Sequence, residues 1–70
     1  MERQRVSSSN LHSVGYDPQS LAMEIKFQSG GVYRYSGVPE ARYLGLMGAG
    51  SKGGYFASYI KDRYPTRKVG

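Results

Sequence analysis

The segment from Leu21 to Phe27 constrains the fold most strongly, because apolar residues occupy every second position in it. They alternate with Ala22, Glu24 and Lys26, and a period of two places alternate side chains on opposite faces of a β-strand. The segment therefore predicts a strand with one face in a core and the other toward water. A lone strand is not stable, so the remaining chain must supply both a sheet and a covering layer.

Two further strands are expected beside this one. The segment Asn10 to Tyr16 alternates imperfectly, and the turn Asp17 to Ser20 follows it, because Pro18 presets the backbone of the second turn position. After the turn residues Gln28 to Gly31, the segment Val32 to Tyr35 returns along the sheet. These segments predict a three-stranded antiparallel meander.

Two helices are expected after the strands. The first spans Pro39 to Met47, because proline suits a first helical position; Gly45 weakens it and Gly48 ends it. The second spans Lys52 to Asp62 and stops ahead of Pro65. A small sheet cannot protect two apolar faces, so both helices must pack on the same one. The predicted class is α+β, with the order β-β-β-α-α.

The 70 residues are expected to form one domain over residues 9–65, after a disordered segment at 1–8 and before a basic tail at 66–70. The chain has no cysteine, which excludes disulfides and thiolate metal sites. No apolar run reaches the roughly 20 residues of a membrane span, and the charged start Met1 to Arg5 is not a secretory signal. We therefore expect a cytoplasmic protein without a membrane partner.

The net charge of +5 is concentrated at the end of the chain. Five cationic residues against one aspartate give residues 52–70 a charge of +4. Such an excess attracts polyanions, and it also serves simply to keep a surface soluble. If the attraction is functional, the cations beyond the second helix start are candidates for contacting nucleic acid: Lys61, Arg63, Arg67 and Lys68.

The hairpin register decides the role of Tyr33 and Tyr35. A three-residue loop, Gln28 to Gly30 with Gly30 left-handed, turns both tyrosines toward the core and leaves Arg34 outside. A two-residue loop would expose them as a base-stacking platform and bury Arg34 without a partner. The cost of that burial favours the longer loop and a structural role for the tyrosines.

The join between the helices is a candidate anion site. Its residues Gly50, Ser51, Lys52, Gly53 and Gly54 lie where helix N–H groups are unpaired, and a lysine there adds charge. The pattern lacks the Gly-Lys-Ser/Thr of a Walker loop, and it matches only by analogy the GxxG loop that clamps nucleic-acid backbones in KH domains. The structural alternative is that Ser51 caps the second helix. The two roles are compatible.

No set of residues suggests catalysis. His12 is the single histidine, and the five carboxylates are scattered without paired placement. We expect no enzymatic activity, no metal and no cofactor.

Several motifs occur in a characteristic order: Leu21 to Phe27, Ser29-Gly30, Tyr33-Arg34-Tyr35, Gly37-Val38-Pro39, Ser51 to Phe56 and Ile60. In this order they resemble the KTSC domain. Its Tyr-x-Tyr motif matches Tyr33 and Tyr35, and its small-residue, Ser-x-Gly, Tyr-Phe segment matches Ala49 to Phe56. The likeness covers about residues 8 to 69, with the extra glycine Gly31 as a departure.

The resemblance implies the fold of that family, which occurs at the C-terminus of some lysyl-tRNA synthetases and as free-standing small bacterial proteins. RNA binding has been suggested for it. Together with the charge and the glycine-rich join, this predicts a small non-enzymatic module that binds RNA or another nucleic acid through phosphate. The alternative is a protein-interaction module, whose marker would be an exposed apolar or tyrosine patch or an open sheet edge.

Overall fold

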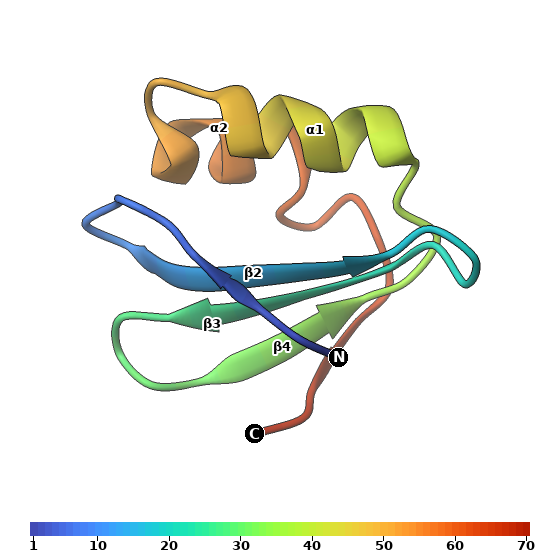
Figure 1. Cartoon of the computed structure of the whole chain (residues 1–70). Helices are drawn as coiled ribbons and strands as arrows, with labels where there is room; N and C mark the ends of the chain where they lie inside the picture. Colours follow the sequence, from blue (N-terminus) through green and yellow to red (C-terminus); the bar gives the residue numbers. More distant parts are fainter.

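The computed structural model describes residues 1–70 and has a layer of two helices on one face of an antiparallel sheet (Figure 1). The five strands follow one another across the sheet in chain order. The elements are β1 (Gln4–Arg5), β2 (Leu11–Asp17), β3 (Ala22–Phe27), β4 (Val32–Tyr35), α1 (Glu40–Gly48), α2 (Lys52–Tyr59) and β5 (Thr66–Lys68). The α+β class is confirmed, with both helices on the same face (Figure 1).

The sheet has five strands instead of the predicted three, and the additional strands lie in both terminal segments. Residues 1–8, expected to be disordered, contain β1, which pairs with β2. Residues 66–68, expected to be part of a basic tail, form β5 along β4. The physical reason is that an unpaired sheet edge offers backbone N–H and C=O groups to any extended segment. Short polar strands on an edge carry no apolar alternation that would reveal them.

The core lies between the helices and the sheet. Met23 and Ile25 of β3 have no exposed surface, so the alternation within β3 is confirmed. Leu46 of α1 and Ile60 just after α2 are equally buried, and they cover these strand residues from above. Leu21 departs from the pattern, because it lies in the turn before β3 with a positive φ of 58° and is 41% exposed. Neither helix is long and apolar enough to cross a membrane.

The second helix ends earlier than predicted, at Tyr59 instead of Asp62. The N–H groups of Ile60 and Lys61 both donate to the Phe56 carbonyl, at 3.0 and 2.8 Å. These bonds satisfy an otherwise free carbonyl at the helix end. Asp62 then has a positive φ of 61°, which no helix accommodates. After α2 the chain descends from the helix layer to the sheet, where it forms β5 (Figure 1).

The β3–β4 register agrees with the three-residue loop. Ile25 lies opposite Tyr33, Met23 lies opposite Tyr35, and Gly30 has a positive φ of 107°. Tyr35 is only 4% exposed, so its predicted place in the core is confirmed.

The sheet face turned away from the helices is called the outer face below. It is more buried than the prediction of a solvent-facing surface implied. Glu24 lies on it and is nevertheless only 5% exposed. Its carboxylate accepts hydrogen bonds from the guanidinium groups of Arg3, at 2.6 Å, and Arg34, at 2.9 Å. The chain before β1 covers this region, and a Cβ on Gly15 would lie 2.6 Å from the Glu2 carbonyl oxygen. The absence of a side chain at Gly15 therefore lets the N-terminal segment approach the sheet.

Gly45 has a packing role that cannot be inferred from its low helix propensity. The ring and hydroxyl of Tyr55 from α2 occupy the space where a Cβ of Gly45 would lie. At Gly48, also in α1, no atom lies within 4 Å of the position that a Cβ would take. Gly45 was expected only to weaken the first helix, whereas it permits the close contact of α1 with α2.

The ion-paired Glu24 predicts a specific loss of stability in acid. Burial alone would raise the pKa of Glu24, but hydrogen bonds and charge from Arg34 and Arg3 outweigh it and lower the pKa below the usual 4.5. The unfolded chain therefore binds this proton at higher pH than the folded chain does. The stabilisation is complete above about pH 4.5 and is lost as pH falls through the lowered folded value.

We expect Glu24→Gln to reduce the free energy of unfolding at neutral pH by about 1–3 kcal/mol, because charge-assisted hydrogen bonds are lost. The difference from wild type should shrink as pH falls below 4.5 and through the lowered pKa of the folded state, because Glu24 then becomes protonated. Urea unfolding followed by circular dichroism across this range measures it, with Glu2→Gln, at an exposed unpaired carboxylate, as the control. A stability difference between Glu24→Gln and wild type that stays constant down to low pH would contradict the lowered pKa of Glu24.

We expect Gly45→Ala and Gly48→Ala to change stability in opposite directions. Alanine at Gly48 should stabilise by about 0.5–1 kcal/mol, because it improves helix propensity without a steric conflict. Alanine at Gly45 should destabilise by about 1–2 kcal/mol, because the Tyr55 ring must move. Thermal unfolding of the two variants compares them directly, and equal shifts in Tm would exclude the proposed role of Gly45.

Candidate nucleic-acid interface

The glycine-rich join is used for capping both helices. The Gly54 N–H donates to Ser51 Oγ at 3.2 Å, so Ser51 is the N-cap of α2. The Lys52 ammonium donates to the Ala49 carbonyl oxygen at 3.1 Å, just beyond the end of α1. A cation in this place complements the negative end of the α1 dipole. Ser51 and Lys52 thus have structural partners, and Gly50 and Gly54 lie exposed beside them.

A groove lined by aromatic rings runs between the end of α2 and the sheet. Phe27 of β3, Phe56 of α2 and Lys61 line both of its adjoining hollows. The first hollow has a volume of about 290 Å³, and its other lining residues are Tyr33, Tyr35, Asp62 and Thr66. The second has a volume of about 510 Å³, and its other lining residues are Ser9, Asn10, Gln28, Ser29, Gly53 and Ala57. We call the two together the aromatic groove.

The rings of the groove are held in edge-to-face contacts. The Phe27 centroid lies 5.8 Å from that of Tyr33 and 5.3 Å from that of Phe56, with interplanar angles of 73° and 69°. Tyr35 meets Phe56 at 5.7 Å and 79°. Aromatic pairs prefer this arrangement because the positive edge of one ring meets the negative face of the other. The groove is therefore a packed cluster whose rim remains open.

The two tyrosines have different roles in this cluster. Tyr35 is in the core, and burial, reinforced by Tyr33 and Asp62, raises its pKa to about 12. Tyr33 is half-buried and lines the wall of the groove. Both tyrosines face the helix side, as the three-residue loop predicts, so the outer-face stacking platform of the shorter loop does not form; Tyr33 packs against the core but is only partly buried.

The predicted cations fall into separate groups. Lys61 lines both hollows, and Lys68 lies opposite Tyr33 in the β4–β5 pair and so shares its face of the sheet. Arg67 lies opposite Arg34 and belongs to the outer face. Arg63 is exposed in the turn after α2 and lines neither hollow. Of the glycines in the join, Gly53 lines the second hollow, at the start of α2.

Phe27 and Phe56 are the aromatic lining residues that were assigned no binding role from the sequence. Each belongs to an apolar strand or helix face and packs against the core. Nothing in their spacing shows that the two rings line a common groove with Lys61. No three His, Cys, Asp or Glu side chains are grouped so as to hold a metal ion, and His12 Nδ1 lies 3.1 Å from Ser13 Oγ.

The fold and this groove define a small α+β domain with an aromatic and basic concavity. A model of the KTSC domain family matches residues 7–64. The crystal structure of a KTSC domain protein from Yersinia pestis superposes with a TM-score of 0.96 at 46% identity, covering 99% of this chain and 97% of that one. The chain therefore belongs to the KTSC domain family.

Two bacterial relatives have the same extent. A protein of Stutzerimonas stutzeri is 39% identical over 64 residues, which cover 91% of this chain and 90% of that protein. A protein of Tsukamurella paurometabola is 33% identical over 61 residues, which cover 87% of this chain and 91% of that protein. The relatives thus match the whole domain and not an isolated motif.

Proposed function

We propose that the protein is a non-enzymatic module that binds single-stranded RNA in the aromatic groove. The observation that carries the proposal is that Phe27, Tyr33 and Phe56 line the same hollow as Lys61. Single-stranded nucleic acid is bound by aromatic side chains that stack on bases, together with cations that follow the backbone. Both components are present here within one concavity.

The charges around the groove support a polyanionic ligand. Lys61 lines both hollows and Lys68 shares the sheet face of Tyr33, whereas Asp62 is the single carboxylate in the lining. Of the cations in residues 52–70, Lys61 and Lys68 lie on the groove side, and their charge would attract a strand that leaves the groove. Gly53 lies at the opposite end, where N–H groups at the start of α2 suit a phosphate.

One observation favours the alternative, a protein-interaction module. Leu44 of α1 is 58% exposed and Tyr59 of α2 is 48% exposed. The Arg42 guanidinium lies 4.8 Å from the centre of the Tyr59 ring, which is a cation–π contact at the surface. An exposed leucine and tyrosine suit a protein partner, but they lie outside the groove and lack its combination of ring and lysine.

We expect Lys61→Ala and Tyr33→Leu to weaken the binding of a fluorescent oligouridine measured by anisotropy. Lys61→Ala should reduce the slope of log K against log salt by about 0.7, which is the value for one phosphate contact on a single strand. Tyr33→Leu should cost about 1–3 kcal/mol, because a stacked base is lost, and should leave the salt slope unchanged.

Tyr59→Leu is the matched control, because Tyr59 is an exposed tyrosine of α2 that lines neither hollow. It should bind RNA as the wild type does. Binding that is undetectable at low salt, indifferent to salt, or equally weakened by all three substitutions would refute the groove as the site. Retention of a protein after nuclease treatment, lost in the Tyr59 variant, would instead favour the alternative.

A further inference from the structure

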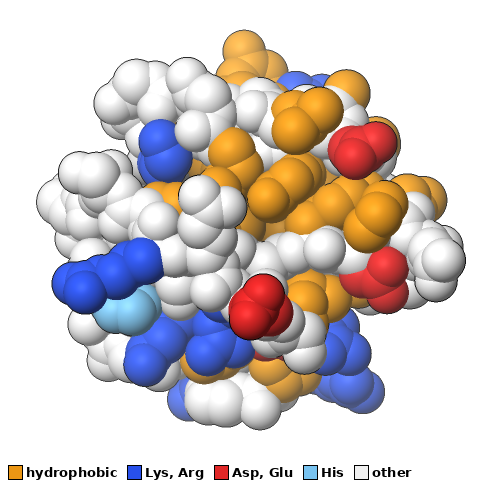
Figure 2. All heavy atoms as spheres, in the orientation of Figure 1, with side chains coloured by type: hydrophobic (Ala, Val, Ile, Leu, Met, Phe, Trp, Pro, Cys, Tyr) orange, Lys and Arg blue, Asp and Glu red, His pale blue; other side chains and the backbone are white.

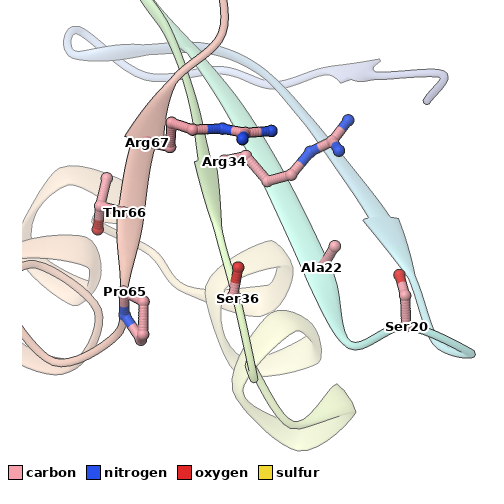
Figure 3. A pocket seen from close by; sticks show the side chains of 7 residues that line it. All are labelled: Ser20, Ala22, Arg34, Ser36, Pro65, Thr66 and Arg67. Atoms are coloured by element: carbon pink, nitrogen blue, oxygen red, sulfur yellow. The ribbon is translucent and has the colours of Figure 1, made fainter.

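The outer face carries a pair of arginines that should repel each other. Arg34 of β4 and Arg67 of β5 are directly opposite in the antiparallel pair. Like charges in this position destabilise a sheet. Both side chains run the same way across the outer face, Arg67 from β5 over β4 and Arg34 from β4 over β3 (Figure 3). The repulsion is therefore not relieved by pointing them apart.

The acidic residues nearby do not neutralise this pair. Glu24 is the one carboxylate in an ion pair, and it is shared between Arg34 and Arg3, so Arg67 has no acidic partner. With Arg67, these groups have a net charge of +2. Asp17 is held within its own turn by the Ser20 hydroxyl and the Gln19 N–H, which lower its pKa. On the visible face of the molecule, cationic side chains accordingly gather on the sheet side, away from the helices (Figure 2).

A hollow of about 410 Å³ lies beside the two arginines (Figure 3). Ser36 contributes an exposed hydroxyl to the hollow, and Arg34 Nε is buried without an acceptor, as is Arg3 Nε outside the hollow. A buried N–H without an acceptor is destabilising unless a ligand or water satisfies it. The hollow thus combines uncompensated positive charge, hydrogen-bond donors and room for a small anion.

We propose that this hollow binds a phosphate monoester dianion through Arg67, Arg34 and Ser36. A group with a charge of about −2 at neutral pH would be attracted by the net charge of +2 on Arg3, Arg34, Arg67 and Glu24, of which Arg34 and Arg67 line the hollow. Guanidinium groups bind phosphate with paired, directional hydrogen bonds. The site is on the opposite sheet face from the aromatic groove, because Arg34 lies between Tyr33 and Tyr35 in β4. It is therefore independent of the RNA-binding proposal.

The test is a ¹H–¹⁵N NMR titration of the whole protein with glycerol 2-phosphate, compared with sodium chloride at matched ionic strength. We expect saturable shifts at the amides of Arg34, Ser36 and Arg67 that chloride does not reproduce. Arg67→Gln should weaken binding by about 10- to 100-fold, which corresponds to one lost charge-assisted hydrogen bond. The control is Arg63→Gln, which removes the same charge from an exposed residue that does not line this hollow.

Two further ligands, uridine 5′-monophosphate and uridine, show whether the hollow recognises a phosphate group alone or a whole nucleotide. Uridine lacks the phosphate and should not bind the hollow. Equal affinity for the nucleotide and glycerol 2-phosphate means that the phosphate alone is recognised, whereas tighter nucleotide binding with shifts beyond the hollow identifies a nucleotide. Shifts that follow chloride equally, or equal losses in Arg67→Gln and Arg63→Gln, would overturn the proposal. Failure of oligouridine to bind at the groove would leave these outcomes unchanged.

Discussion

The pairing of β3 with β4 is the interaction on which the rest of the structure depends. Its register places Tyr35 in the core and Tyr33 on the wall of the aromatic groove. The same register places Arg34 on the outer face, opposite Glu24. A slip by one residue would exchange the two faces and bury an arginine without its carboxylate. Both candidate binding sites therefore follow from one three-residue loop that Gly30 makes possible with its positive φ of 107°.

The ends of the chain complete a sheet that its central strands begin. β1 and β5 cover the edges of a meander that would otherwise present unpaired backbone groups. Arg3 links the N-terminal segment to Glu24, and β5 brings Arg67 beside Arg34. The edge strands thus help to stabilise the domain and also create the charge pattern of its outer face.

Local sequence patterns predicted the strand, loop and helix cap that depend on residues close together in the chain. The alternation in β3 and the loop ending at Gly30 predicted the meander, and Ser51 was recognised as a cap. The edge strands were missed because backbone pairing needs no apolar pattern. For the groove, Lys61 and Gly53 were predicted as binding residues and line it, whereas Tyr33 was given a structural role, and Phe27 and Phe56 were given no binding role because each belongs to an apolar strand or helix face.

A ¹H–¹⁵N NMR titration with a short single-stranded oligouridine tests the central claim, that the aromatic groove beside α2 binds RNA, most directly. The account predicts saturable shifts that cluster on Phe27, Tyr33, Phe56 and Lys61, weaken with added salt, and spare the exposed Leu44 on α1. Shifts spread over all basic residues alike, or no saturable shift at low salt, would contradict it.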